Sequence, residues 1–325
     1  MKTLDTKLAK IRSSKYTPKD FIIADAKDGD MGFGRACPGP RRDGSGKLKS
    51  KAEYLAAMTE MTKSGLVDIM LMSASSCETL SAKGFFTKSK VTPAVRLNDA
   101  TDIWSQRGSS YRETESYPFR TARPDKIKKI SDLGLYSVTF SNDVEADLYS
   151  LEEYTKFREE ATAAKLRHFL EVFNPAMDIG LQGADLGTYI NDCIVRSLGG
   201  VLSNEHPLFL KMQYNGAAAM EELASYDPGK LIVGILGGAR GTTRDTFELA
   251  SQCEKHGGRV ALFGRKFNFA EAPLELVRLM RGVIEGNIKS ADAVKSYHDY
   301  LTKHKLTPDR DLKTDIEITD PVLKA

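Results

Sequence analysis

The sequence predicts an α/β protein in which eight parallel β-strands close into a barrel surrounded by helices, the (β/α)₈ or TIM-barrel fold. Three observations favour this fold: eight short apolar runs, helix-length amphipathic stretches between them, and a length of 325 residues. Strands that alternate with helices are typical of a parallel sheet, and α/β barrels of this length fold as one domain. We therefore expect a single domain over residues 1–325.

Each apolar run has the length of a strand and is followed by a segment long enough to form a helix. The runs span residues 21–26, 67–73, 92–98, 135–140, 168–173, 208–214, 231–237 and 259–264. An open, doubly wound sheet is the alternative arrangement. Such sheets often carry a GxGxxG fingerprint after the first strand, and the sequence has none there, which favours the closed barrel.

Amphipathic segments between the apolar runs predict helices at residues 51–65, 150–166, 187–200 and 242–258. The last two segments end in pairs of glycine, which are suited to helix C-caps. The segment after residue 305 is polar, and we expect a peripheral helical tail there.

Two segments interrupt the alternation of strands and helices. Residues 27–47 are rich in glycine and proline and predict a long loop over the mouth of the active site. Residues 101–127 mix aromatic residues with arginines, and a solvated insertion or a subunit contact is the simplest interpretation. The arginines of this second segment are Arg107, Arg112, Arg120 and Arg123.

The composition argues against several classes of partner. A formal net charge of +3 with 28% charged residues does not predict binding to nucleic acid or to an anionic membrane. The charged N-terminal segment does not resemble a signal peptide, and the apolar stretch at 231–239 is too short to span a bilayer. A cytoplasmic protein is expected. The four cysteines are widely spaced and do not form a metal-ligand pattern.

Lys211 is the first candidate for a catalytic residue. It lies in the apolar run 208–214, where alternate side chains point into the barrel and an ammonium group is costly to bury. A buried lysine loses its proton more readily and can then attack a ketone to form a Schiff base. The structural alternative is a lysine that reaches solvent from the end of the strand.

Glycine-bearing turns follow the seventh and eighth predicted strands, at GILGGARG and LFGRK. Barrel enzymes often bind phosphate at this position, because free backbone N–H groups there face an anion. Arg265 follows directly after Gly264 and could donate a bidentate hydrogen bond to phosphate. These features predict a phosphate site, although tight turns alone would also explain the glycines.

The order of these motifs resembles the class I, Schiff-base aldolases, in particular the archaeal-type fructose-bisphosphate aldolases and the bacterial tagatose-bisphosphate aldolases. The similar segments are Lys211 to Gly216, Gly237-Gly238 and Gly264-Arg265. The resemblance implies that Lys211 forms the Schiff base. It also implies that the phosphate group is held by Gly237, Gly238, Ala239, Gly264 and Arg265.

The same resemblance implies roles for residues in three other predicted strands. Asp25 matches a strand-one aspartate that lies near the lysine and positions substrate hydroxyls, whereas Asp28 and Asp30 are expected to be exposed or to cap the loop. Arg96 stands where the family usually has lysine, and we expect it to bind substrate and to lower the pKa of Lys211 by its charge. The archaeal tyrosine before a proline is replaced by Phe173, and the resemblance to tagatose-bisphosphate aldolases assigns the acid/base role to Glu171. A purely structural ion pair is the alternative for Glu171.

Together these residues predict a class I aldolase that forms a Schiff base between Lys211 and a phosphorylated ketose or ketone, with no metal and no cofactor. Acyl or ketol transfer on the same scaffold is an alternative reaction, and a non-catalytic phosphosugar-binding protein is an alternative of a different class. The expected partner is a small phosphorylated sugar or ketone. A homo-oligomer is expected.

Overall fold

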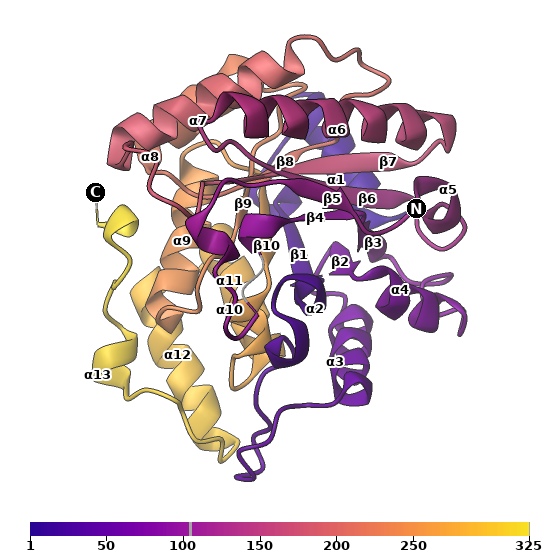
Figure 1. Cartoon of the computed structure of the whole chain (residues 1–325). Coiled ribbons are helices and arrows are strands. Elements are labelled where there is room, and N and C mark those ends of the chain that lie inside the picture. Colours follow the sequence, from indigo (N-terminus) through magenta and orange to yellow (C-terminus); the bar gives the residue numbers. More distant parts are fainter. Residues whose placement is uncertain (104–105, 325) are drawn as a thin grey trace.

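The computed structural model, which describes residues 1–103 and 106–324, contains a closed barrel of eight parallel strands (Figure 1). Neighbouring strands in the barrel follow their order along the chain, as in a (β/α)₈ barrel. The predicted fold is therefore confirmed, and each of the eight apolar runs overlaps one barrel strand. The strands are β1 (Ile22–Lys27), β2 (Ile69–Met72), β3 (Thr92–Arg96), β6 (Leu133–Thr139), β7 (Arg167–Phe173), β8 (Leu210–Met212), β9 (Gly234–Leu236) and β10 (Val260–Phe263).

Helices surround the barrel and include the four that the sequence predicts. The outer helices are α3 (Lys51–Ser64), α4 (Ala74–Ser81), α5 (Pro124–Ile127), α6 (Val144–Ala163), α7 (Gly183–Leu198), α8 (Ala217–Tyr226), α9 (Thr243–Lys255), α10 (Arg265–Asn268), α11 (Pro273–Ile284) and α12 (Ser290–Lys303). The glycine caps are only partly as predicted. Gly257 after α9 has a positive φ of 96°, whereas Gly199 after α7 is right-handed with a φ of −61°. In the described ranges, none of the helices has a long enough apolar stretch to cross a membrane.

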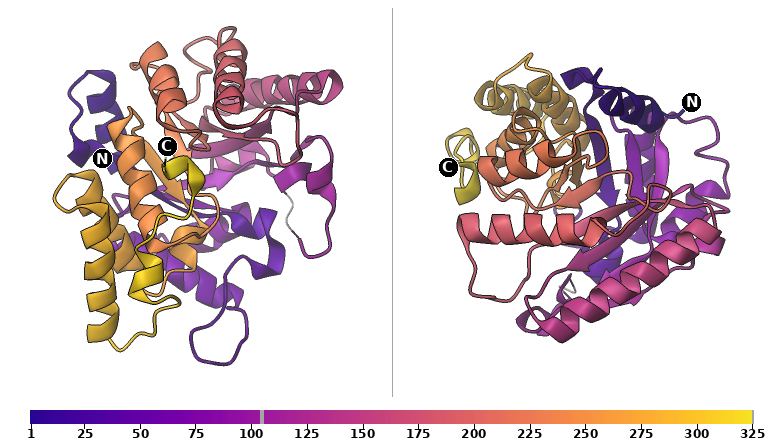
Figure 2. Two further views of the ribbon diagram at one scale, coloured as in Figure 1. Left: turned by 90° about the vertical axis from the view of Figure 1, so that its left-hand side faces the viewer. Right: turned by 90° about the horizontal axis from the view of Figure 1, so that it is seen from above.

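The N-terminal helix α1 (Thr3–Arg12) covers the end of the barrel at which the strands begin. This helix is not among those that the sequence analysis predicts. Its buried residues Leu4, Leu8 and Ile11 belong to the same apolar cluster as the inward side chains of the strands. This spacing of four and three residues places them on one face of the helix. The indigo helix lies at one end of the barrel in both views of Figure 2.

Alternation along each strand separates two apolar clusters. In β1, Ile22, Ala24 and Ala26 belong to the cluster inside the barrel, whereas Phe21 and Ile23 belong to the cluster between the barrel and the helices. Side chains two residues apart therefore share one side of a strand. This alternation decides which polar residues can enter the barrel.

The two segments that interrupt the alternation contain short regular elements rather than only loops. The segment after β1 forms α2 (Gly29–Gly32), a 3₁₀ turn at Gly34–Ala36 and an antiparallel bridge between Pro40 and Leu48. The insertion after β3 forms an antiparallel pair, β4 (Asn98–Ala100) with β5 (Pro118–Arg120). Residues 104 and 105 of this insertion lie outside the described residues.

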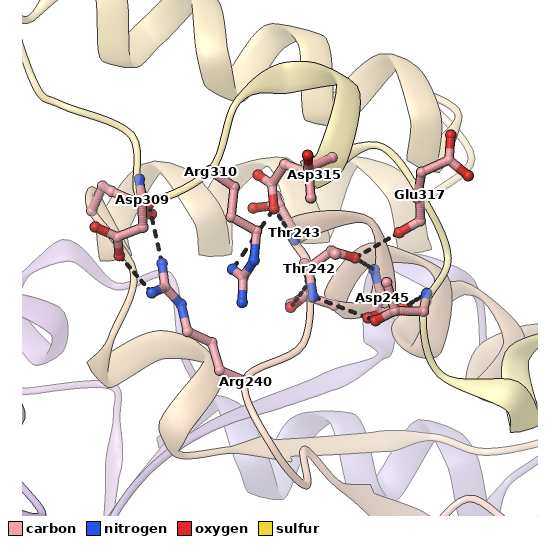
Figure 3. Close-up of polar contacts among 12 residues, drawn as sticks. Arg240, Thr242, Thr243, Asp245, Asp309, Arg310, Asp315 and Glu317 are labelled. Atoms are coloured by element: carbon pink, nitrogen blue, oxygen red, sulfur yellow. Dashed lines mark hydrogen bonds and ion pairs between the residues drawn. The ribbon is translucent and has the colours of Figure 1, made fainter.

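The C-terminal tail follows the outer surface beside α9 and α12, and it is yellow in Figure 2. Its contacts with the segment after β9 are drawn in Figure 3. The Thr243 backbone N–H donates to Asp315 Oδ1 at 2.8 Å, and Thr242 Oγ1 donates to the Glu317 carbonyl at 2.8 Å. Asp245 accepts from the backbone N–H of Thr319 at 2.8 Å. The polar tail is thus held to the barrel by hydrogen bonds.

We expect Gly234→Ala to lower the free energy of unfolding by about 1 to 3 kcal/mol, the usual range for overpacking. A Cβ there would lie 2.6 Å from the Leu210 carbonyl oxygen and 2.7 Å from Val260 Cβ, so neighbouring strands would have to move apart. Urea unfolding measures the change. The control is Gly200→Ala, where a Cβ meets no atom within 4 Å. Equal stability of both variants would contradict this account of β9.

Candidate active site

Four polar side chains enter the barrel near the C-terminal ends of its strands. Arg96, Ser137, Glu171 and Lys211 continue the inward series of Ala94, Leu135, Phe169 and Phe209, and all four are buried. The strand register pairs Ser137 with Glu171 and Glu171 with Lys211 across neighbouring strands. Parallel strands in this register bring these side chains next to each other.

Glu171 is the centre of the resulting network. Its Oε1 lies 2.5 Å from Lys211 Nζ, and its Oε2 lies 2.6 Å from Arg96 Nη2. Ser137 Oγ accepts from Arg96 Nη1 at 2.6 Å and donates to Glu171 Oε2 at 2.8 Å. The buried carboxylate therefore has a cation on each side, which offsets the loss of hydration.

Asp28 completes the network, which corrects the expectation that it is exposed or caps its loop. It is only 5% exposed, and its Oδ2 accepts from Arg96 Nε at 2.6 Å. Burial opposes ionisation of Asp28, but Arg96 and Lys211 lower its pKa below the ordinary value. Burial also opposes the charge of Arg96, yet Glu171 and Asp28 raise its pKa. The network thus contains two carboxylates and two cations.

Asp25 does not lie beside Lys211, contrary to the expectation from the resemblance. It alternates with the inward residues Ala24 and Ala26, so its side chain points out of the barrel toward α10. Lys27 Nζ lies 3.2 Å from Asp25 Oδ1 and donates to Asn268 Oδ1 at 2.9 Å. Burial raises the pKa of Asp25, and the charge of Lys27 opposes this shift. These contacts hold α10 against β1.

A chamber of about 350 Å³ lies over the network. Lys211, Glu171, Arg96 and Asp28 form part of its floor, and the segment after β1 covers one side with Gly29, Gly32, Phe33 and Ala36. The predicted long loop therefore does lie over the site. The insertion after β3 contributes Ile103.

The two glycine turns reach the same chamber. Gly237, Gly238, Gly264 and Arg265 all line it, and Gly238 has a φ of 65°, which a side chain would disfavour. Ala239, the remaining residue expected to bind phosphate, is exposed and does not line the chamber. The predicted turns therefore meet Lys211 and Glu171 in one cavity.

Arg265 lies at the edge of the chamber, with its guanidinium carbon 4.8 Å from the centre of the Phe33 ring. Burial lowers the pKa of Arg265, and the positive charge of Arg112 lowers it further. Arg112 belongs to the insertion after β3, so the charge of this insertion acts on Arg265. In the described part of the chain Arg265 makes no ion pair with a carboxylate.

Asp309 of the C-terminal tail joins two loops near the chamber. Its Oδ2 lies 2.5 Å from Nη1 of Arg240, which follows the glycine turn after β9, and this ion pair is drawn in Figure 3. The same carboxylate binds Arg42, from the segment after β1, at 2.9 Å. Hydrogen bonds and charges of Arg42 and Arg240 lower the pKa of Asp309, although burial opposes the shift. The tail thus restrains the glycine turn and the cover of the chamber together.

No protein-family model matches the chain, and no curated protein sequence matches it. Among solved structures, an archaeal fructose 1,6-bisphosphate aldolase matches with a TM-score of 0.64 at 15% identity, covering 87% of this chain and 99% of that chain. An archaeal aldolase with its catalytic lysine bound to a carbinolamine intermediate matches with a TM-score of 0.62 at 16% identity, over 87% and 99%. The fructose-bisphosphate aldolase of Slackia heliotrinireducens matches with a TM-score of 0.61 at 12% identity, over 92% and 90%.

These matches confirm the resemblance to the class I aldolases at the level of the fold. Identities of 12 to 16% do not carry an activity from one protein to another. The reaction of this chain must be argued from its own side chains.

We expect Asp28→Asn to lower the free energy of unfolding by about 2 kcal/mol at pH 7, the usual value for a hydrogen bond between charged groups. Because the pKa of Asp28 is depressed by folding, its contribution is complete above the unfolded value of about 4 and is lost as the pH falls through the folded value. The difference from wild type should therefore shrink below about pH 4.

Urea unfolding at several pH values between 3 and 7 measures this difference. Asp192→Asn, at an exposed position on α7, is the matched control. A difference between Asp28→Asn and wild type that stays constant with pH would contradict the ion pair with Arg96.

Proposed function

We propose that this protein is a class I aldolase in which Lys211 forms a Schiff base with a phosphorylated ketone or ketose. The observation that carries the proposal is the 2.5 Å contact between Lys211 Nζ and Glu171 Oε1 at the base of a chamber. A lysine held against a carboxylate has a proton acceptor at the atom that must become a nucleophile. The position at the C-terminal ends of barrel strands also supports a catalytic role.

In the proposed reaction Glu171 accepts a proton from the Lys211 ammonium, and the free amine attacks the substrate carbonyl to give a carbinolamine. Glu171 then returns the proton to the carbinolamine oxygen, which leaves as water, and a protonated imine remains. The iminium withdraws the electron pair of the neighbouring carbon–carbon bond as Glu171 takes the proton of the β-hydroxyl. An aldehyde departs, the enamine is protonated, and water hydrolyses the imine to release the ketone.

Arg96 and Ser137 act as positioning residues in this proposal. Both contact Glu171 Oε2, which leaves Oε1 facing Lys211. Such second contacts fix the direction of the catalytic oxygen and reduce the reorganisation that each proton transfer requires.

The glycine turns are proposed to bind the phosphate group of the substrate. Gly237, Gly238 and Gly264 bring backbone to the chamber wall without side chains, and Arg265 adds a donor suited to a phosphate oxygen. Strands β9 and β10 follow β8 in the barrel, so the phosphate would lie beside the carbonyl that Lys211 attacks. The exposed Ala239 takes part only through its backbone in this proposal.

The lysine of one structural neighbour supports the choice of reaction, because that archaeal aldolase is described with its catalytic lysine bound to a carbinolamine of the substrate. Transfer reactions and simple binding of a phosphosugar remain the competing functions. Trapping the imine separates binding from both reactions, and release of aldehyde without an added acceptor separates aldol cleavage from transfer.

We expect borohydride to trap a covalent adduct on Lys211 when the protein is incubated with dihydroxyacetone phosphate, because reduction makes the imine stable. Lys211→Met should keep the fold, since Glu171 retains its contacts with Arg96 and Ser137, and should lose the adduct and turnover. Mass spectrometry of peptides locates the label. Lys156→Met, at an exposed position on α6, is the control. An adduct on another residue would refute the assignment.

Glu171→Gln should lower kcat by about 10²-fold or more, the usual contribution of a general acid or base, while the fold remains intact. The amide keeps the shape of the side chain but accepts a proton far less readily. Steady-state kinetics with the substrate that labels Lys211 measures the effect, and Glu159→Gln on the exposed face of α6 is the control. A rate near that of wild type would leave Glu171 with a structural role.

Arg265→Ala should raise KM for a phosphorylated substrate much more than it lowers kcat, because an anchoring contact stabilises the bound ground state and the transition state alike. A rise of about 10-fold or more is expected for one lost charged hydrogen bond. The exposed Arg123→Ala should leave KM unchanged. An unchanged KM in Arg265→Ala would remove this residue from the phosphate site.

A further inference from the structure

Carbon atoms make up most of the wall above the catalytic network. Phe173 is two residues beyond Glu171 on the same inward side of β7, and both residues line the chamber. Leu236 has the equivalent inward position in β9. The large apolar side chains that line the described part of the chamber are Phe33, Ile103, Phe173, Leu236, Leu262 and Phe269.

The polar side chains of this wall already have partners within the protein. Asn268 accepts from Lys27 Nζ at 2.9 Å and donates to the Cys37 carbonyl at 2.8 Å. Cys37 Sγ lies 3.0 Å from the Tyr54 hydroxyl oxygen. These groups offer few hydrogen bonds to the hydroxyls of a bound sugar.

The cations of the chamber are suited to one phosphate group. Arg96 is held by Asp28, Glu171 and Ser137, and Lys211 is held by Glu171. Among the described lining residues this leaves Arg265 beside the glycine turns. A second phosphate near Phe173 would face apolar side chains.

We propose that the site takes a monophosphate whose carbon chain beyond the reacting groups carries hydrogen or alkyl substituents rather than hydroxyls. The assignment of the reacting groups rests on the proposed function, but the shape and polarity of the chamber do not. A hydroxyl enclosed by these side chains loses its hydrogen bonds to water, whereas each methylene gains by leaving water. The substrate class is therefore a deoxygenated phosphorylated ketone, not a ketose bisphosphate.

Two five-carbon probes without a carbonyl group test this proposal separately from catalysis. Pentyl phosphate and a pentitol 5-phosphate share the chain length and the phosphate and differ by four hydroxyls. We expect isothermal titration calorimetry to give a Kd for pentyl phosphate at least about 10-fold lower, since several methylenes are buried. Equal or tighter binding of the pentitol phosphate, or of a hexitol 1,6-bisphosphate, would overturn the proposal, as would binding of neither probe.

Variants locate the effect in the chamber. Phe173→Asn should reduce the ratio of the Kd of the pentitol phosphate to the Kd of pentyl phosphate. Phe173→Tyr, which keeps the ring, should reduce this ratio less. Leu202→Asn, at a position 73% exposed, should leave the ratio unchanged. An unchanged ratio in both Phe173 variants would refute the assigned wall.

Lys211→Met should still prefer pentyl phosphate, because neither probe forms an imine. If borohydride traps no adduct in the wild-type protein, the Schiff-base reaction is therefore refuted, but the comparison of the two probes is unaffected. A preference for the polyol probe together with a Lys211 adduct would refute the substrate class and leave the reaction standing.

Discussion

The Glu171 carboxylate, shared between Lys211 and Arg96, is the interaction on which the site depends. A buried carboxylate is tolerated only where cations and hydrogen-bond donors replace its water, and three strands must supply them in one plane. The register of β6, β7 and β8 provides that plane by placing Ser137, Glu171 and Lys211 side by side. Strand β3 pairs directly with β6 on its other side and brings Arg96 next to this row. The order and register of these strands are thus requirements of the proposed chemistry as well as of the fold.

The barrel interior is divided along its axis as a consequence. Toward the N-terminal ends of the strands the interior is apolar. The ring centres of Phe169 and Phe209 lie 4.6 Å apart there, and α1 covers this end of the barrel. One step further along β7 and β8 the inward residues become Glu171 and Lys211. The apolar layer gives the burial that stabilises the barrel and holds the strands in register. The charged layer above it contributes less to stability and holds the residues of the proposed reaction.

Sequence reasoning predicted the barrel and most of the floor because those features follow from strand positions. Apolar runs located all eight strands, and Arg96, Glu171 and Lys211 stand in three of them. The same reasoning chose Asp25 where the structure has Asp28 in the network. Strand β1 is buried on both sides, so its hydrophobicity does not alternate, and the sequence does not show which side faces inward. The alanines at 24 and 26 mark the inner side only after the register is known. The sequence analysis missed the helix α1, although the spacing of Leu4, Leu8 and Ile11 is that of an amphipathic helix and could have shown it.

Asp28 gives the network a property that a simple Lys–Glu pair would lack. In the proposed reaction the proton of the Lys211 ammonium passes to Glu171, so that both groups become neutral in the same step. Without a further carboxylate, Arg96 would then be a buried cation whose neighbour had lost its charge, and the transfer would be strongly opposed. Asp28 stays bound to Arg96 Nε throughout, so one ion pair remains intact while the other is discharged. The network as a whole, made of Asp28, Arg96, Glu171 and Lys211, carries no net charge before the transfer and none after it. The buried site can therefore move a proton internally without a change in its total charge, so the transfer leaves no buried charge without a partner.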